Sequence, residues 1–248
     1  MILTGNTVFI SGGGSGIGRG LAEALHKRGN QIIISGRRKS HLEATTKANP
    51  GMASVELDLQ DPQSIAAVAK KLIAQYPKLN VLINNAGIMQ IDDAAGVVDD
   101  AVLVSTVNTN LLGTIRLTSA FIEQLKRQPF ATIIYNTSVL GYVPLAMTAV
   151  YSSTKAALHS YALSQRYQLK NTAVRVIEIA PPWVQTDLLG SNNEPRAMPL
   201  AEFIKETIGV LGTDAQEVLV ERAKPLRNNP GPNEGALVTQ FNDSMQQS

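Results

Sequence analysis

The sequence predicts a doubly wound α/β fold, in which one parallel β-sheet is covered by helices on both faces. Short apolar runs rich in β-branched residues alternate along the chain with amphipathic segments of helical spacing. The runs are apolar at nearly every position, as in strands that are buried on both faces. Strands that alternate with helices pair in parallel through right-handed crossovers.

Seven runs are the expected strands. They lie at 7–10, 31–35, 54–57, 81–84, 131–138 and 174–180, with a short last run at 217–221. The best marked helix begins at Pro62, because Asp61 can cap its first turn and proline fits the first helical position. Its apolar residues continue at helical spacing to Tyr76.

We expect a single domain over residues 1–248, since this length suits one α/β unit. The polar stretch at 186–200 is interrupted by glycine and proline and predicts a loop over a site. We expect a substrate loop and lid helix at about 186–210, and an irregular tail at about 228–248.

Composition excludes several classes of function. The formal net charge of +2 is too small for a nucleic-acid-binding surface. The chain has no cysteine, which fits a reducing compartment. It shows neither a signal peptide at the start nor a run of 18 apolar residues, so we expect a cytoplasmic protein without membrane contact.

A glycine-rich segment, SGGGSGIG at 11–18, joins the first strand to the first helix. Glycines allow a tight turn and a close approach of the backbone to a pyrophosphate, which then lies at the positive end of the helix. The spacing Gly12-x-x-x-Gly16-x-Gly18 differs from the familiar G-x-G-x-x-G, but it serves the same physical purpose.

The end of the second strand indicates which dinucleotide is preferred. Folds that bind NAD usually place a carboxylate there for the ribose 2′-hydroxyl. This chain has Gly36, followed by Arg37 and Arg38. Guanidinium groups suit a 2′-phosphate, so the sequence favours NADP over NAD, although arginines at this position could also be surface charges.

Tyr151 and Lys155 lie four residues apart at the start of an apolar helical segment. Residues at this spacing share one face of a helix. The pair could be a proton-transfer site, or a surface lysine that packs along a tyrosine. Alone, the spacing is weak evidence.

Together these motifs resemble those of the short-chain dehydrogenase/reductase family. The matching residues are Ser11 with the glycine motif, Asp58 after the third strand, Asn84-Asn85-Ala86-Gly87 after the fourth, and Asn110, Ser138, Tyr151 and Lys155 in the family's order. The resemblance covers residues 5 to about 188 and looks closest to a DltE-like branch. It implies a Rossmann-type sheet and hydride exchange between a nicotinamide and a carbonyl or secondary alcohol.

The resemblance also implies site residues. The catalytic tetrad would be Asn110, Ser138, Tyr151 and Lys155, with Ser138 donating to the reacting oxygen and Asn110 holding a water that connects Lys155 to solvent. The cofactor-binding residues would be Gly12, Gly14, Ser15, Gly16, Ile17, Gly18, Arg37, Arg38, Asp58, Leu59, Asn85, Ala86, Gly87, Tyr151, Lys155, Pro181, Val184 and Thr186. The substrate-binding residues would be Ser138, Leu140, Tyr142, Tyr151 and Trp183, although Leu140, Tyr142 and Trp183 could equally be core residues.

Two departures from the family pattern stand out. Pro182 occupies a position that is usually glycine, which stiffens the loop that carries Thr186 toward the nicotinamide. The usual glycine-rich last strand is missing, so we expect a homodimer rather than a tetramer. Its interface would use apolar residues of the helices at about 99–127 and 151–170, such as Leu111, Leu112, Ile115, Leu117, Phe121, Ile122 and Leu125.

Electrostatics explain why a lysine would accompany the tyrosine. Lowering a tyrosine pKa from about 10 to 7 requires about 4 kcal/mol. One ammonium at about 4 Å and an effective dielectric constant of about 20 supplies that amount. We therefore expect Lys155 to lower the pKa of Tyr151 enough for proton exchange with the substrate oxygen.

Other classes of function remain open but less favoured. His26, His41 and His159 lack ligand spacing, so no metal site is expected. A non-catalytic dinucleotide-binding sensor or scaffold would have lost Tyr151 or Lys155, and both are present. An epimerase of the longer, extended relatives would need a further substrate domain. The small-molecule substrate itself is not predicted.

Overall fold

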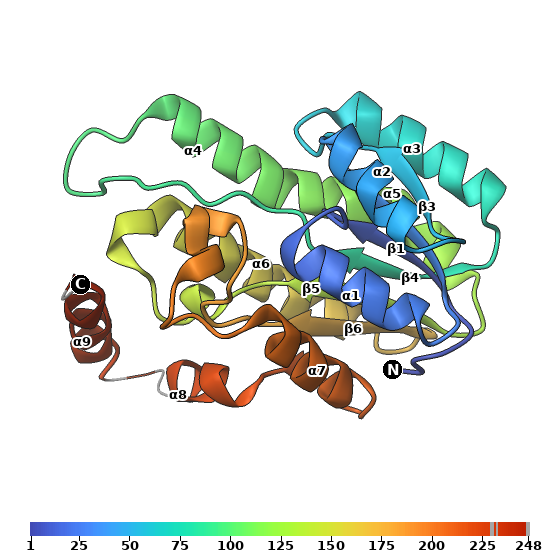
Figure 1. Ribbon diagram of the computed structural model, residues 1–248. Coiled ribbons are helices and arrows are strands. Elements are labelled where there is room, and N and C mark those ends of the chain that lie inside the picture. Colours follow the sequence, from blue (N-terminus) through green and yellow to red (C-terminus); the bar gives the residue numbers. More distant parts are fainter. Residues whose placement is uncertain (229–230, 232, 247–248) are drawn as a thin grey trace.

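The computed structural model describes residues 1–228, 231 and 233–246 of the 248-residue chain. Its core is one seven-stranded parallel sheet in the order β3-β2-β1-β4-β5-β6-β7 (Figure 1). The strands are β1 (Thr7–Ser11), β2 (Gln31–Gly36), β3 (Ala53–Glu56), β4 (Leu79–Asn84), β5 (Ala131–Asn136), β6 (Val174–Ile179) and β7 (Glu217–Val218). The predicted doubly wound parallel sheet is confirmed.

Alternate residues of each central strand enter different cores, because successive side chains of a strand point to opposite faces. In β1, Val8 and Ile10 pack on one face of the sheet and Phe9 packs on the other. In β2, Ile32 and Ile34 lie on the first face and Ile33 on the second. The two cores explain why these strands read as continuous apolar runs.

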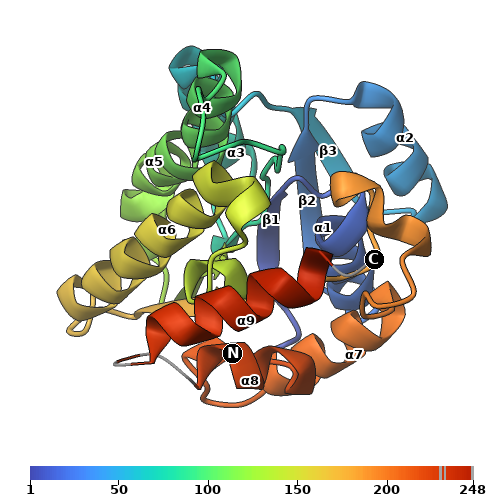
Figure 2. The ribbon, with the colours of Figure 1, turned by 90° about the vertical axis from the view of Figure 1, so that its left-hand side faces the viewer.

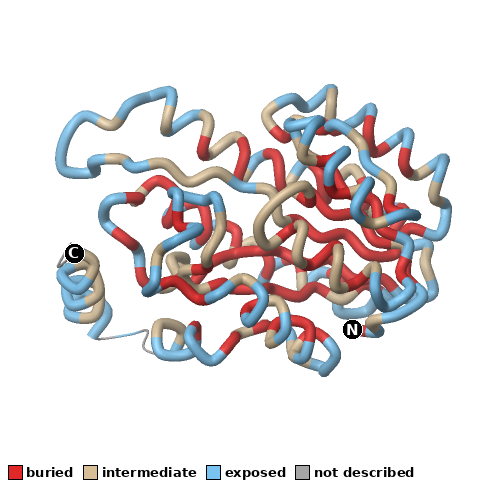
Figure 3. Tube along the Cα trace, in the orientation of Figure 1, coloured by how far each residue is buried: buried red, intermediate tan, exposed pale blue. Residues whose placement is uncertain are grey.

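Helices cover both faces of the sheet (Figures 1 and 2). One face is covered by α1 (Gly16–His26), α2 (Lys39–Ala48) and α7 (Leu200–Leu211). The other is covered by α3 (Pro62–Gln75), α5 (Thr114–Lys126) and α6 (Ala149–Gln168), with α4 (Asp100–Val107) packed against α6. The buried residues therefore follow the strands and the inner faces of these helices (Figure 3).

Helix α3 begins as predicted. The Asp61 carboxylate accepts a hydrogen bond of 2.8 Å from the amide of Gln63, and Pro62 occupies the first turn. Strand β5 is two residues shorter than predicted, because Ser138 instead caps a 3-10 turn, Val139–Gly141, with its hydroxyl. The last strand also shortens, to two residues.

The predicted loop at 186–200 contains a 3-10 segment, Leu188–Asn193, and is closed at its base by a bridge between Val184 and Met198. Helix α7 follows, and its Phe203, Ile208 and Leu211 are buried in the core against α1. A lid role for this region stays a prediction.

The expectation of an irregular tail at 228–248 was wrong for residues 234–246, which form helix α9 (Glu234–Gln246) after the short α8 (Lys224–Arg227). Helix α9 stands away from the sheet (Figure 1), and its Asn242 bonds to the backbone of Pro144 and Ala146. Its few apolar residues make a weak periodic signal, which is why the sequence did not reveal it. Residues 229, 230, 232, 247 and 248 of the expected tail lie outside the described residues.

No helix in the described part of the chain combines the length and apolarity that a bilayer crossing requires.

Candidate active site

The candidate site lies at the carboxyl ends of β1 and β4, where the strand order reverses direction. Strand β1 pairs with β2 on one side and with β4 on the other, so the loops that follow β1 and β4 lead away from each other. Crevices at such a reversal are the usual ligand sites of open α/β sheets. The glycine segment and the Asn85-Ala86-Gly87 segment both begin here.

The glycine segment is built for close backbone contact. A Cβ on Gly18 would lie 2.2 Å from the carbonyl oxygen of Gly12, inside van der Waals contact. Gly12 has φ of +69°, and a Cβ there would lie 2.8 Å from the Cα of Ala86. Only glycine fits these positions, and the amides at the start of α1 stay accessible to an anion.

Polar contacts join the glycine segment to the loop after β4. The Ser11 hydroxyl accepts hydrogen bonds from the amides of Asn85 (3.1 Å) and Ala86 (3.2 Å). The Asn85 side chain in turn donates to the carbonyls of Ser11 and Gly12, each at 3.1 Å. The two predicted cofactor-binding segments are therefore joined as one unit, and the Ser11 hydroxyl takes part in it.

Other predicted cofactor residues surround this unit. Thr186 lies against Gly16, since a Cβ there would be 3.4 Å from the side chain of Thr186. Arg38 donates a hydrogen bond of 2.9 Å to the Ser15 hydroxyl, so its guanidinium lies at the glycine segment. The Asp58 carboxylate accepts from the amide of Gln60 (2.9 Å) within its own turn. Its predicted contact with adenine stays a prediction.

The remaining cofactor candidates are distributed as follows. A Cβ on Gly14 would lie 3.3 Å from the Cβ of His41 on α2. Leu59 is buried, and its carbonyl passes close to Gly113 of the 108–113 helical turn. The carbonyl of Pro181 accepts from the amide of Val139, and Val184 is buried beside Met198. Ile17 packs partly buried on the core. The structure gives no specific contact by which to judge Arg37.

The four predicted catalytic residues converge. Tyr151 and Lys155 are buried on the same face of α6, with the Lys155 ammonium 5.4 Å from the centre of the Tyr151 ring. Ser138 forms a hydrogen bond with the Tyr151 hydroxyl. A Cβ on Gly87 would lie 3.3 Å from Oδ1 of Asn110 and 3.8 Å from Nζ of Lys155, so Gly87 lies between these two side chains.

Asn136 is a residue that the sequence analysis missed. Its carbonyl accepts a hydrogen bond of 2.7 Å from the Lys155 ammonium. Its side-chain amide donates to Oδ1 of Asn85 at 2.9 Å, and Asn85 donates to Gly12. An unbroken chain of hydrogen bonds therefore connects Lys155 to the glycine segment. A polar residue at the end of the apolar strand β5 was the available signal.

Burial shifts the ionisation of both central groups. It raises the pKa of Tyr151 to about 12, although the hydrogen bond with Ser138 acts in the opposite direction. It also lowers the pKa of Lys155 to about 8. The expectation that Lys155 lowers the pKa of Tyr151 was therefore wrong for the site as it stands here, because the calculation omitted desolvation of both groups. Near neutral pH, the Tyr151 hydroxyl therefore carries its proton.

Asn110 has a different set of contacts from the predicted one. Its side chain accepts from the amide of Ile88 and donates to the carbonyl of Ile88, both at 2.8 Å, and reaches Thr154 at 3.3 Å. It lies in a π-helical turn, Asn108–Gly113, of the kind often found at functional sites. Its side chain thus clamps the loop after β4, and its water-holding role stays a prediction.

The predicted substrate residues lie on two loops. Leu140 is partly buried against the core. The Tyr142 hydroxyl donates to Glu217 (2.6 Å), and Nε1 of Trp183 donates to Ser191 (2.7 Å). The polar atoms of Tyr142 and Trp183 therefore have protein partners, and the roles of all three residues toward substrate stay predictions.

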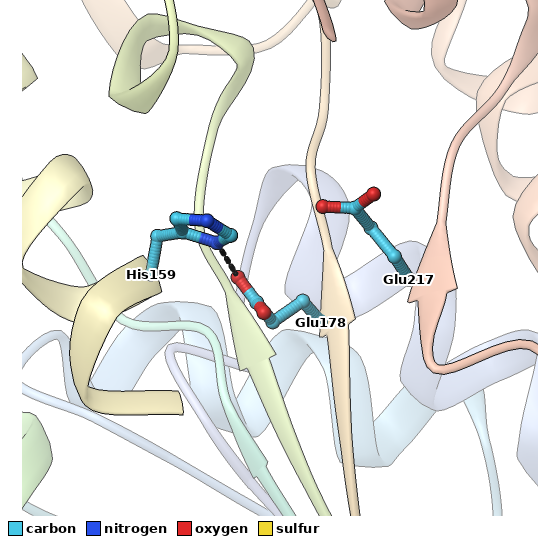
Figure 4. Close-up of side chains that lie close together, drawn as sticks. All are labelled: His159, Glu178 and Glu217. Carbon is cyan, nitrogen blue, oxygen red and sulfur yellow. Dashed lines mark hydrogen bonds and ion pairs between the residues drawn. The ribbon is translucent and has the colours of Figure 1, made fainter. Parts of the chain in front are cut away.

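His159, Glu178 and Glu217 form a second polar cluster, with possible ligand atoms within 4.8 Å of one another (Figure 4). Nδ1 of His159 lies 2.7 Å from Glu178, which also pairs with Arg166 at 3.3 Å. Glu217 pairs with Arg227 at 2.9 Å and accepts from Tyr142. Each carboxylate already has a guanidinium partner, so we interpret the cluster as a structural network that joins α6, β6, β7 and α8.

Asp92, in the loop after β4, contacts the first turn of α6. Its two carboxylate oxygens accept hydrogen bonds from the amides of Ala149 (3.1 Å) and Val150 (2.9 Å), at the start of α6. No local signal could have indicated this contact, because the partners are 57 and 58 residues away in the chain.

Comparison with known proteins gives a consistent picture. Residues 6–197 match a family described as short chain dehydrogenase. The "uncharacterized oxidoreductase DltE" of Bacillus subtilis (strain 168) is 36% identical over 248 residues, covering 98% of this chain and 98% of that protein.

Solved structures are similar in fold. A short chain dehydrogenase from Burkholderia cenocepacia J2315, in complex with NADP, has a TM-score of 0.83 and 25% identity, and the alignment covers 100% of both chains. A short chain dehydrogenase/reductase from Burkholderia phymatum, in complex with NAD, has a TM-score of 0.82 and 19% identity, covering 92% of this chain and 93% of that one.

Gly18→Ala is expected to lower the free energy of unfolding by about 1–3 kcal/mol or more, because the new Cβ meets the backbone of Gly12. Gly209→Ala, in helix α7, is the matched control. A Cβ there meets nothing within 4 Å, so it should stabilise by about 0.5–1 kcal/mol. Urea unfolding of the three proteins measures both effects. Equal stability of Gly18→Ala and wild type would contradict the close approach.

Lys155→Met tests the buried ammonium through pH. Because the folded-state pKa of Lys155 is about 8 and its ordinary value is 10.5, the penalty for burying the charge is full below pH 8 and disappears as pH rises through 10.5. Between pH 8 and 10, the stability of wild type relative to the variant should therefore rise by about 2 kcal/mol. Denaturant unfolding at several pH values measures this difference, and a difference independent of pH would refute the shift.

Proposed function

The chain belongs to the short chain dehydrogenase family, and on this premise we propose that it is an NADP(H)-dependent oxidoreductase that interconverts a carbonyl group and a secondary alcohol, with Tyr151 as the acid–base group. One observation carries the proposal. Ser138, Tyr151 and Lys155 are buried, and the Lys155 ammonium lies beside Gly87, in the loop that hydrogen bonds join to the glycine segment. This arrangement puts a proton donor beside the expected nicotinamide position.

The residues present fit a dinucleotide. A Cβ on Gly12 or Gly18 would collide with protein backbone, so glycine at both positions lets the segment fold tightly, and the first turn of α1 has no side-chain cap. Anions are stabilised at the N-terminus of a helix, so this end of α1 suits the pyrophosphate. When bound, the nicotinamide supplies or accepts the hydride, and the chain supplies orientation and proton transfer.

The ionisation of the site supports carbonyl reduction. With its pKa raised to about 12, Tyr151 carries its proton near neutral pH and can donate it to a carbonyl oxygen as that oxygen gains negative charge. Ser138 can donate a second hydrogen bond to the same oxygen. The pKa of Lys155, about 8, makes its ammonium a suitable source for reprotonating Tyr151.

A preference for NADP is part of the proposal. The second strand ends without a carboxylate at Gly36, and the guanidinium of Arg38 lies on Ser15 in the glycine segment. Charge-assisted contacts of this kind suit a 2′-phosphate. The similar structures named above contain NADP in one case and NAD in the other, so these local contacts carry the choice.

A homodimer is proposed as the assembly. Of the apolar residues considered from the sequence, Leu117, Phe121 and Leu125 cover the sheet, whereas Leu112 is exposed. Further exposed apolar side chains on α4 and α6, which contact each other, are Leu103, Val104, Leu163 and Tyr167. Such a shared apolar surface suits a two-fold interface. A cytoplasmic location stays a prediction.

Tyr151→Phe should abolish turnover with little effect on cofactor affinity, because it removes only the hydroxyl that transfers the proton. Tyr161→Phe, on the same helix, is the control and should leave turnover near that of wild type. The assay follows the absorbance of the reduced nicotinamide with a panel of aldehydes, ketones and alcohols and with both cofactors. Residual turnover of Tyr151→Phe above a few per cent of wild type would reject its role.

Wild type should favour NADPH over NADH in kcat/KM by roughly a hundredfold, since two partly exposed phosphate contacts supply about 2–3 kcal/mol. Arg38→Ala should lose more of this preference than Arg37→Ala, because Arg38 reaches the glycine segment. The preference should shrink as salt increases. Gly36→Asp with Arg37→Ile should favour NADH. Equal use of both cofactors by wild type at low salt would argue against the phosphate site.

Leu163→Glu should convert the dimer to a monomer, since it puts a charge into the proposed apolar interface. Phe130→Glu is the matched control, because Phe130 is exposed to the same degree (46%, against 47% for Leu163) and lies outside these helices. Multi-angle light scattering at micromolar concentration gives the mass of each. A monomeric or tetrameric wild type would show that the proposed assembly is wrong.

A further inference from the structure

Helix α6, which carries Tyr151 and Lys155, has no cap of its own. The residue before its first turn is Thr148, whose side chain makes no capping hydrogen bond. The amides of the first turn of a helix need acceptors from elsewhere, because they have no partner within the helix. Here both carboxylate oxygens of Asp92 supply them, to Ala149 at 3.1 Å and to Val150 at 2.9 Å.

The loop that carries Asp92 is fixed at alternate residues. Ile88 is held through both its amide and its carbonyl by the side chain of Asn110. Gln90 donates to the Ser105 hydroxyl of α4 at 3.1 Å. The amide of Asp92 donates to the carbonyl of Met147 at 3.0 Å. Residues 87–92 therefore form a strap from Gly87, beside the Lys155 ammonium, to the residue immediately before Tyr151.

We propose that Asp92 is a positioning residue for Tyr151: by capping α6 through this strap, it fixes the Tyr151 hydroxyl relative to Gly87 and the bound nicotinamide. The inference rests on the proposed function, because it assigns Asp92 a role in that reaction. A carboxylate also interacts favourably with the positive end of a helix, which makes aspartate better suited to this place than a neutral acceptor. Asp92 itself touches no reacting atom, so its effect is on geometry.

The neighbouring acidic residue provides a matched control. Asp93 is exposed, and its carboxylate accepts from the amide of Ala95 within the same loop. Asp61 provides a second control, because its carboxylate caps α3, a helix on which no candidate site residue lies. The Asp93 variant controls for the loss of a charge in this loop, and the Asp61 variant controls for the loss of a helix cap elsewhere. An effect seen only in the Asp92 variant is then due to the cap of α6.

The variants to compare are Asp92→Ala, Asp92→Asn, Asp93→Ala and Asp61→Ala. Asp92→Ala should lower kcat by about 10- to 100-fold while leaving KM for the cofactor near wild type, because small displacements of a reacting group have effects of this size. Asp92→Asn keeps one acceptor oxygen but turns an amide nitrogen toward the other backbone N–H, so its kcat should lie between those of wild type and Asp92→Ala. Asp93→Ala should behave as wild type. Asp61→Ala should lower Tm as Asp92→Ala does, with kcat unchanged.

Amide hydrogen exchange at residues 149–151 gives a readout that needs no substrate. Exchange there should become faster in Asp92→Ala and stay at the wild-type rate in Asp93→Ala. If it is unchanged in Asp92→Ala, or if kcat is unchanged while exchange rises, the positioning role is rejected. A wild type that reduces no carbonyl of the panel with either cofactor would instead reject the proposed function, and exchange would still decide whether Asp92 holds the helix.

If Asp92→Ala does not fold, Asp92→Glu takes its place. Its longer side chain keeps the charge and the acceptor oxygens but must displace the start of α6, so kcat should fall about tenfold or more at a Tm near that of wild type. A wild-type kcat for a folded Asp92→Glu would overturn the proposal.

Discussion

A buried ammonium with no carboxylate partner among the residues that the structure describes sets the conditions for the whole candidate site. Lys155 is 4% exposed, and burial is the sole cause that lowers its pKa, to about 8. Its hydrogen bond goes to the carbonyl of Asn136, whose side chain holds Asn85, which holds the glycine segment. A buried charge is costly unless it is hydrogen-bonded. The end of β5, the loop after β4 and the turn after β1 must therefore keep their relative positions so that this chain of hydrogen bonds is preserved.

The burial that lowers the pKa of Lys155 also raises the pKa of Tyr151. Water is kept from both members of the pair, so each is pushed toward its neutral form: the tyrosine holds its proton more tightly and the lysine less tightly. The two pKa values, ordinarily 10.0 and 10.5, therefore move apart to about 12 and about 8, so Tyr151 retains its proton and Lys155 gives up its proton more readily. In the proposed reaction, Lys155 would therefore supply a proton as well as a charge.

The positions of the candidate site residues are set by contacts between loops as well as by the sheet. The parallel strands bring Gly12, Asn85 and Ser138 to one edge, but Tyr151 lies on a helix that begins beyond two turns of loop. Asn110 and Asp92 fasten the loop after β4 to both sides of the site. Farther along α6, a network of His159, Glu178, Arg166 and Glu217 fixes the same helix to the last strands. The catalytic helix is thus held at its start and along its length.

The sequence by itself determined the doubly wound sheet, because its apolar runs and helical periodicities follow from local burial. It also located the glycine segment, and its resemblance to the short-chain dehydrogenase/reductase family singled out Asn110, Ser138, Tyr151 and Lys155 as candidate residues. The helix at 234–246, the partner of Arg38, the linking role of Asn136 and the cap provided by Asp92 came only from the tertiary structure. Each depends on segments far apart in the chain or on a weak local pattern. The direction of the Tyr151 pKa shift likewise depends on burial, which three-dimensional packing decides.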